Sequence, residues 1–425
     1  MKTEELEKQV SNETETKRKK PEVLAPGGTL EKMKTAILYG ADACYIGGEA
    51  YGLRSRAGNF DYTEMQEAVD FAHEHGAKVY VAANMVTHEG DEHGAGDFFR
   101  SIRDIGVDAV LISDAALMDI CVSQAPGLPI HLSTQASATN YQTLNFWKDE
   151  GLERVVLARE VSLEEIQEMN ENVDVEIEAF IHGAMCISYS GRCVLSNHMS
   201  HRDANRGGCA QSCRWKYGLF DMPFAGEHSP VGAGEEGIDE PFSMSAVDLS
   251  MIHHIPDLVE AGIDSLKIEG RMKSIHYVST VANVYRAAVD SYCEDPENYV
   301  LKEEWVDELW KVAQRELATG FYYHIPTEEE QLFGVRRKIP RYGFIGQVLD
   351  YDPETQIATV QQRNNFSKHD TIEFYGPGMR HFEQTLDELW DEDGQEIDVA
   401  PHAMMICKMK VDQPVKPLDM IRKQK

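Results

Sequence analysis

The stretch EVLAPGGTLEKMKTAILYGADACYI (22–46) decides the fold of this chain. It holds a β-rich run at Glu22–Ala25, an amphipathic helical pattern over Leu30–Tyr39, and a second β-rich run at Ala43–Ile46. Between the helix and the second run stands YGAD (39–42), whose glycine is placed to end the helix in the left-handed conformation. The stretch therefore predicts a strand–helix–strand unit of a parallel sheet.

The same junction recurs along the chain, each time with a glycine between a helical pattern and a β-rich run. The further copies are HGAK (75–78), IGVD (105–108), EGLE (150–153) and AGID (261–264). Further strands are predicted at Lys78–Ala83, Ala109–Ser113, Ile130–Ser133, Arg154–Leu157, Val175–Ile181 and Ser265–Ile268, and further helices at Thr63–His75, Phe98–Ile105 and Leu163–Asn170. Ser162 and Glu165 form a capping box for the last of these helices.

About eight such units over roughly 250 residues predict a (β/α)8 TIM-like barrel. A doubly wound sheet is the alternative, and it is disfavoured because no G-x-G-x-x-G follows a strand. The seventh unit is interrupted by a cysteine-rich insertion after its strand, at 182–242. Further helical patterns follow at 276–292 and 302–317.

From about residue 342 the pattern changes to alternating strands, in FIGQVLDY, IATVQQR, DTIEFYG and AMMICKMK. These strands predict a small antiparallel β-barrel. We therefore expect three parts: a flexible lead-in at 1–20, a barrel domain at 21–340, and a C-terminal β domain at 341–425.

The composition is that of an ordinary globular protein, with 42% apolar residues and a formal charge of −31. We expect a cytoplasmic protein without a membrane segment, because there is no apolar signal-peptide core and no run of roughly 20 apolar residues. Reduced thiols are the rule in that compartment, so the cysteines are not expected to form disulfides. The overall acidity disfavours nucleic acid as a partner, although basic runs at 200–217, 336–342 and 408–425 leave a local cationic face open.

Polar residues follow most of the predicted barrel strands, at the end of the barrel where TIM-barrel active sites lie. The candidates are Gly27, Gly28, Tyr51, Arg54, Arg56, Asn84, Gln135, Arg159, Glu160, His182, Glu269 and Arg271. Several cations at one rim suit a small anionic metabolite or a phosphate. The alternative is that individual members pack loops or form salt bridges.

Four of the eight cysteines fall within one polar, glycine-rich segment, as Cys186-x6-Cys193-x15-Cys209-x3-Cys213. The other four, Cys44, Cys121, Cys293 and Cys407, lie in apolar surroundings typical of small buried residues. Four thiolates suit zinc or an iron–sulfur cluster. Structural zinc sites usually bring their ligands in closely spaced pairs, and only the second pair here fits, so the spacing favours iron–sulfur.

Searches for other catalytic motifs leave the catalytic residues unidentified. The nearest string to H-E-x-x-H is His88–His93, which has one residue too many, and neither G-x-S-x-G nor a P-loop occurs.

The run EAFIHGAMCISYSGRCVLS (178–196) resembles the signature of the collagenase-like peptidase family of unknown catalytic type. The segments PEVLAPGGTLEKMKTAILYGADACYIGG (21–48) and SLKIEGRMKS (265–274) are similar to that family as well, and HRDANRGGCAQSCRWKY (201–217) most resembles its tRNA hydroxylation members. The resemblance implies 5-hydroxyuridine formation at the tRNA wobble position with prephenate as co-substrate. It also implies a [4Fe–4S] cluster on Cys186, Cys193, Cys209 and Cys213.

The leading hypothesis is accordingly a tRNA-modifying enzyme that binds a small anion in its barrel, alone or with a paralogous or identical partner. The substrate-binding candidates are Arg54, Arg56, Asn84, Gln135, His182, Glu269 and Arg271. A peptidase with a structural or catalytic metal remains the runner-up. A non-catalytic RNA- or partner-binding module with structural zinc is a third alternative.

Overall fold

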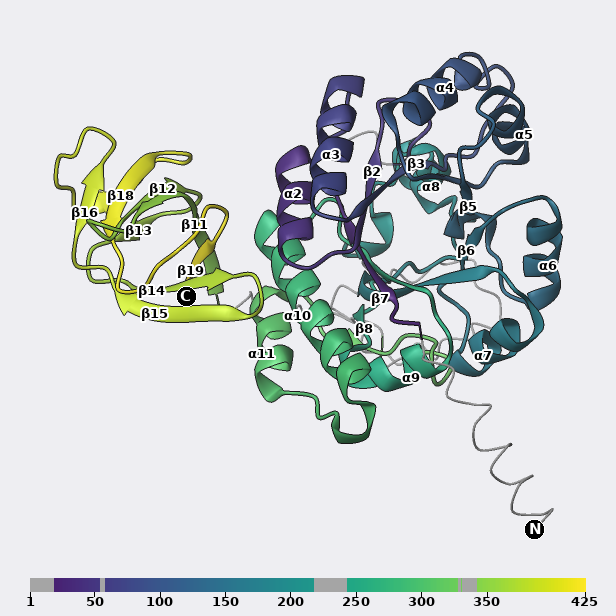
Figure 1. The fold of residues 1–425 in the computed structure, drawn as a ribbon. Coiled ribbons are helices and arrows are strands. Elements are labelled where there is room, and N and C mark those ends of the chain that lie inside the picture. The colour runs from purple at the N-terminus through teal and green to yellow at the C-terminus, as the bar shows by residue number, and fades with distance from the viewer. Residues whose placement is uncertain (1–18, 54–57, 218–242, 328–329, 331–341) are drawn as a thin grey trace, which may run out of the picture.

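The structure, a computed structural model, describes residues 19–53, 58–217, 243–327, 330 and 342–425. Its larger domain is a closed barrel of parallel strands (Figure 1). The strands are β1 (Glu22–Pro26), β2 (Ala43–Gly47), β3 (Lys78–Ala83), β4 (Ala109–Ile112), β5 (Ile130–Leu132), β6 (Arg154–Val156), β7 (Glu176–Ala184) and β9 (Ser265–Ile268). Each pairs with the next, and β9 closes the barrel against both β7 and β1. The predicted TIM-like barrel is confirmed.

Helices cover the outside of the barrel, with the strands inside them (Figure 1). They are α2 (Leu30–Leu38), α3 (Tyr62–Glu74), α4 (Ala95–Ile105), α5 (Ala115–Gln124), α6 (Tyr141–Asp149), α7 (Leu163–Asn172), α9 (Ile255–Glu260), α10 (Ile275–Glu294) and α11 (Glu303–Val312). The capping box of Ser162 and Glu165 is confirmed at the start of α7. The pattern predicted over 302–317 is helical only as far as Val312, because the backbone becomes extended at Ala313.

Two short strands extend the sheet beyond the barrel. β8 (Asp248–Ser250) runs antiparallel to the end of β7, and β10 (Leu317–Ala318) pairs with β8. They fix the chain that returns from the insertion beside the carboxyl end of β7. Within the insertion itself the structure describes α8 (Leu195–Ser200) and two short 3-10 turns, η2 (Ala204–Arg206) and η3 (Ser212–Arg214).

The C-terminal domain is antiparallel, as predicted. Its strands are β11 (Tyr342–Asp352), β12 (Ile357–Gln362), β13 (Phe366–Ser367), β14 (Thr371–Gly376), β15 (Arg380–Thr385), β16 (Leu389–Asp391), β17 (Val399–Ala400), β18 (Ile406–Lys410) and β19 (Met420–Gln424). Seven of them form one sheet in the order β15-β14-β19-β11-β12-β18-β16, and β13 pairs with β17. Alternate side chains of β11, β12 and β18 fill the core, as the burial of Val348, Val360 and Cys407 shows.

The C-terminal domain packs against the barrel at α2, α10 and α11 (Figure 1). The Tyr39 hydroxyl donates to the carbonyl oxygen of Tyr375 at 2.9 Å. Arg422, which is fully buried, donates to Glu373 of its own domain at 2.7 Å and to Glu308 of α11 at 2.8 Å. A buried ion network therefore joins the two domains. None of the helices in the described residues is long and apolar enough to span a membrane.

Candidate active site

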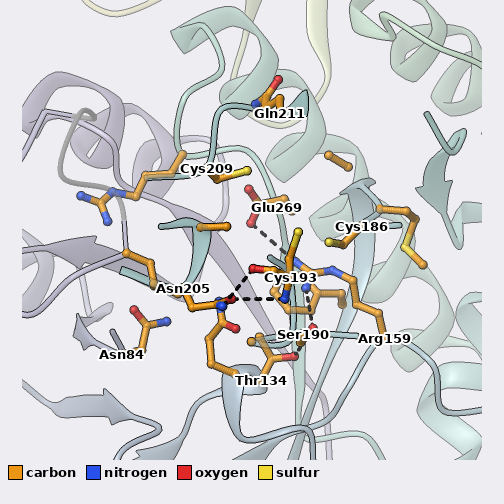
Figure 2. Close-up of a pocket in the computed structure, with 18 of the residues that line it drawn as sticks. Asn84, Thr134, Arg159, Cys186, Ser190, Cys193, Asn205, Cys209, Gln211 and Glu269 are labelled. Atoms are coloured by element: carbon orange, nitrogen blue, oxygen red, sulfur yellow. Dashed lines mark hydrogen bonds and ion pairs between the residues drawn. The ribbon is translucent and has the colours of Figure 1, made fainter. Parts of the chain in front are cut away.

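A cavity of about 250 Å³ lies at the end of the barrel where the strands terminate at their carboxyl ends. Its floor comes from barrel residues such as Tyr45, Ala82, Leu111 and Phe180, and its upper wall comes from the cysteine-rich insertion. Figure 2 shows side chains from both sources around one space. The volume lies just below the usual range for ligand pockets, which begins at about 300 Å³. The position is the one where TIM barrels bind their ligands.

All four clustered cysteines, Cys186, Cys193, Cys209 and Cys213, line this pocket. In Figure 2 the side chains of Cys186, Cys193 and Cys209 point towards the same space. The insertion predicted to carry a metal site thus lies at the mouth of the barrel. The remaining cysteines lie elsewhere. Cys44, Cys121 and Cys407 are buried, as predicted for small apolar side chains, whereas Cys293 is only partly buried.

Specific backbone contacts hold the loop of Cys193. The Asn205 amide nitrogen donates to the Cys193 carbonyl oxygen at 3.0 Å, and the Asn205 amide oxygen accepts the Cys193 N–H at 3.4 Å. Gly191 has a φ of +71°, and a Cβ there would lie 2.5 Å from the carbonyl oxygen of Gln135. The loop therefore requires glycine at 191 to lie this close to the barrel.

The turn that contains Asn205 also fixes the insertion to the loop after β3. The Asn205 carbonyl oxygen accepts the Val86 N–H at 3.0 Å. Arg206 donates to both carboxylate oxygens of Asp91 and to the Val86 carbonyl oxygen. The hydrogen bond from Arg206, with that from the His88 N–H, lowers the pKa of Asp91 to about 2. One short turn thus holds a cysteine on one side and the β3–α4 loop on the other.

The thiols lie close enough to affect one another electrostatically. Burial raises the pKa of Cys186, and Cys193 and Cys209 raise it further, while Arg159 opposes them. Burial also raises the pKa of Cys213, which Arg214 opposes. A bound metal would offset this mutual repulsion, because thiolates are the ligating form. The four thiols and the adjacent arginines therefore fit a metal centre.

A single zinc ion and a [4Fe–4S] cluster require different arrangements of four thiolates. In the part of the chain that the structure describes, no three His, Cys, Asp or Glu side chains converge on one point as a single ion requires. A single tetrahedral zinc would need all four sulfurs at about 2.3 Å from one atom. In a [4Fe–4S] cluster each thiolate binds a different iron, so the sulfurs do not have to converge. By their chemistry the four thiols suit either centre.

Arg159 stands between the insertion and the barrel floor. Its guanidinium lies 3.8 Å from the centre of the Phe180 ring, donates to the Ser190 hydroxyl at 3.3 Å, and is 3.9 Å from the Glu269 carboxylate (Figure 2). Stacking on an aromatic face fixes the plane of an arginine while leaving its edge available for an anion. Arg159 is thus well placed to orient an anionic ligand.

Three more cations line the pocket from β9 and the loop that follows it. Lys267 is almost fully buried and donates to Glu178 at 2.5 Å. Arg271 donates to the Asn59 amide oxygen at 2.5 Å and lies against Gly47, where a Cβ would be 2.3 Å from the guanidinium. The pKa of Lys273 is lowered chiefly by burial and also by the neighbouring arginines. The pocket therefore has a cationic wall in a protein of high net negative charge.

Two amide side chains, Asn84 after β3 and Gln135 after β5, also line the pocket. The Asn84 amide nitrogen donates to the Ser133 hydroxyl at 3.0 Å. The Asn84 Oδ1 and Gln135 Oε1 atoms are both buried and have no hydrogen-bond partner among the residues that the structure describes. Both oxygens therefore lack a protein partner in the described part of the pocket.

The pocket brings together four of the predicted substrate-binding residues, namely Asn84, Gln135, Glu269 and Arg271, and also Arg159. Arg54 and Arg56 lie outside the described residues. Gly27, Gly28, Tyr51 and Glu160 are not among the lining residues. Gly28 nevertheless has a structural role near the pocket, since a Cβ there would lie 2.1 Å from the carbonyl oxygen of Arg271.

His182, also predicted to bind substrate, is placed behind the pocket wall. The pairing of β7 with β9 shifts register between Phe180 and His182, which marks a β-bulge. Phe180 points into the barrel, but His182 packs on Tyr277 and Tyr285 of α10, with its Nδ1 3.3 Å from the Tyr285 hydroxyl. Burial lowers the pKa of His182 to about 3, so its ring is neutral.

Some lining residues were not predicted from the sequence. Lys267 lies within a predicted strand, where a lysine among apolar residues is a signal that its charge has a buried partner. Lys273 and Ser190 lie in loops, and Thr134 and Asn205 lie in short 3-10 turns, where sequence alone does not show which way a side chain points.

The fold and the pocket together define a class of protein: a TIM barrel with a four-cysteine insertion beside its ligand pocket. Comparison with known families agrees. The chain matches the models of peptidase family U32 over residues 28–332 and of the U32 C-terminal domain over residues 340–422. The chain belongs to peptidase family U32, the family expected from its sequence.

Among relatives, the chain is 53% identical to a tRNA hydroxylation protein of Bacillus subtilis (strain 168), with 96% of each chain covered. It is 34% identical to tRNA hydroxylation protein P of Escherichia coli (strain K12), covering 90% of this chain and 92% of that protein. It is also 35% identical to a 23S rRNA 5-hydroxycytidine synthase of Escherichia coli (strain K12), over 64% of this chain and 40% of that protein.

Proposed function

We propose that this protein is an enzyme that hydroxylates tRNA, forming 5-hydroxyuridine at the wobble position. The observation that carries the proposal is the convergence of four cysteines and a cationic wall on one barrel pocket. The named activities of the relatives, hydroxylation of tRNA and formation of 5-hydroxycytidine in rRNA, support the same chemistry.

The proposed metal group is a [4Fe–4S] cluster on Cys186, Cys193, Cys209 and Cys213. The donor set supports it, since four thiolates suit a cluster and all four line one pocket. The long spacing between Cys186 and Cys193 favours it over zinc. When bound, the cluster would supply electron transfer beside the pocket. Arg159 and Arg214 would balance part of its thiolate charge.

The proposed co-substrate is a small anion, and prephenate is the specific candidate. The cationic wall formed by Arg159, Lys267, Arg271 and Lys273 supports an anion, because carboxylates bind best to such donors. Arg159 and Arg271 offer planar guanidinium edges, and Lys267 stands at the floor of the pocket. A direct test is calorimetric titration of anaerobically purified protein with prephenate, in which Arg159→Met should weaken binding.

The proposed tRNA substrate is tested by nucleoside analysis. A strain lacking the gene, and any paralogue, should lose 5-hydroxyuridine from its tRNA, and plasmid-borne protein should restore it. Restoration by the wild-type protein but not by Cys193→Ser would support the proposal. Unchanged 5-hydroxyuridine in the deletion strain would overturn it. Peptidase activity, the alternative, has no nucleophile–histidine pair to support it among the described lining residues, which include no histidine.

A further inference from the structure

Two amide side chains of the pocket, Asn84 and Gln135, have acceptor atoms for which an anionic ligand gives no partner. Asn84 Oδ1 and Gln135 Oε1 are buried acceptors without a partner in the described part of the chain. A buried acceptor left unpaired costs free energy, so such atoms in a pocket indicate that a ligand completes them. Both side chains come from the ends of barrel strands, which are rigid positions for recognition.

The orientation of Asn84 follows from its neighbours. Ser133 Oγ accepts the Gln135 N–H at 3.4 Å. The Asn84 amide nitrogen donates to the same oxygen at 3.0 Å, which turns Asn84 Oδ1 away from Ser133. The Ser113 hydroxyl holds the Asn84 carbonyl oxygen at 3.1 Å. Asn84 Oδ1 is therefore the acceptor that a ligand would pair.

Gln135 lies directly beneath the cysteine loop. A Cβ on Gly191 would lie 2.7 Å from Gln135 Oε1, so the backbone between Ser190 and Cys193 passes over this acceptor. A group held by Gln135 would thus lie under the loop that carries a metal-binding cysteine. In Figure 2, Asn84 and Arg159 lie on opposite sides of the labelled residues, which separates the Asn84 acceptor from that guanidinium.

These acceptors match a neutral donor and not an anion, because two carbonyl dipoles repel a carboxylate. We propose that Asn84 and Gln135 form an acceptor subsite that receives the N3–H group of the target uracil. This inference rests on the proposed tRNA hydroxylation and specifies how the base is recognised. Apolar side chains such as Leu53, Leu111 and Met185 line the same pocket and suit the faces of a planar heterocycle.

The subsite distinguishes uracil from cytosine by its hydrogen-bond pattern. Uracil has a hydrogen on N3, whereas N3 of cytosine carries a lone pair that would face the acceptors. A site built around a hydrogen bond rejects the analogue that lacks the donor, because the buried partner is left unpaired. The acceptor pair thereby makes the pocket selective for uridine.

The test uses anticodon stem-loop RNAs that carry uridine, 3-methyluridine or cytidine at the wobble position. Their affinities for anaerobically purified wild-type protein, Asn84→Ala, Gln135→Ala and Asn84→Asp are measured by fluorescence anisotropy. Gln66→Ala, on the outer surface of α3 where its side chain pairs with Asp70, is the matched control. The readout is the ratio of affinities between RNAs, which a general loss of folding does not mimic.

We expect wild-type protein and Gln66→Ala to bind the uridine RNA about tenfold more tightly than either other RNA. Asn84→Ala and Gln135→Ala should reduce that preference towards unity, while Asn84→Asp, which keeps an acceptor, should retain it. Equal binding of the three RNAs by wild-type protein, no binding of any, or an unchanged preference in both alanine variants would overturn the inference. Loss of 5-hydroxyuridine in the deletion strain would still support the proposed function in those cases, so the two failures are distinguishable.

Discussion

The two ends of the barrel interior hold similar charged groups but use them differently. Towards the amino ends of the strands, Arg154 contacts Glu22 at 2.8 Å, Glu176 at 2.7 Å and Glu178 at 3.3 Å. At the carboxyl ends, Arg159 is 3.9 Å from Glu269, and two amide oxygens have no partner among the described residues. Charged side chains that are paired with one another indicate a structural role. Polar atoms of the pocket that lack a hydrogen-bond partner indicate a binding role.

Removing Glu178 should have the largest effect on stability. Glu178→Ala would leave Lys267 and part of Arg154 without their buried counter-charge, at a cost of about 3–5 kcal/mol in the free energy of unfolding. Urea unfolding followed by circular dichroism measures it. The control is Glu67→Ala, which breaks a surface pair with Lys34 and should cost less than about 1 kcal/mol. Equal losses in the two variants would contradict the structural role of the interior network.

At the other end of the barrel, replacing a cysteine should remove metal and leave the fold. Cys193→Ser should lower the affinity for iron at least about tenfold, since even the partners that orient ligands are worth that much. The measurement is iron and sulfide content after anaerobic reconstitution. Cys293→Ser, a half-buried cysteine outside the pocket, is the control and should retain both. If Cys193→Ser retained its iron, Cys193 would not be a ligand of the metal site.

A smaller effect is expected at Asn205, which orients Cys193 through its backbone. Asn205→Ala should weaken iron binding by roughly tenfold while leaving all four thiols in place. Asn172→Ala, whose side chain donates to a carbonyl oxygen within α7, is the matched control. Competition with an iron chelator gives the affinity. An affinity for iron equal to that of the wild-type protein would show that the turn of Asn205 does not position Cys193.

The smallest effect concerns pH. Because burial holds the folded pKa of His182 at about 3, below the unfolded value of 6.5, its contribution to stability is present above pH 6.5 and is lost on acidification. Near pH 5.5 this loss is about 1.4 kcal/mol. His182→Gln should therefore lose less stability than wild type between pH 7.5 and 5.5 in urea unfolding. If the free energies of unfolding of wild type and His182→Gln fell equally between pH 7.5 and 5.5, the His182 ring would not be neutral and buried.

The sequence predicted the regular part of this molecule well, because parallel strands and their glycine-ended helices leave a strong local pattern. The bounds of β3 and β9 agree residue for residue with the prediction. The position of the cysteines at the pocket followed from their place after the seventh strand. The amide candidates Asn84 and Gln135 were found by the same rule, since strand ends converge in a barrel.

Features that depend on tertiary pairing were not predictable. Simple alternation along β7 would place His182 inside with Glu178 and Phe180, and only the bulge seen in the β7–β9 pairing redirects it. The turn of Asn205 gave no local signal either, because its role consists of contacts with Cys193 and Val86, which are distant in sequence. The same is true of β8 and β10, which are too short for a periodic pattern.

The central claim is that the four cysteines at the barrel mouth hold an iron–sulfur cluster. The most direct test is the iron, zinc and acid-labile sulfide content of protein purified without oxygen, together with its Mössbauer spectrum. The account predicts about four iron and four sulfide per chain, as a [4Fe–4S] cluster requires. One zinc per chain, with neither iron nor sulfide, would contradict it.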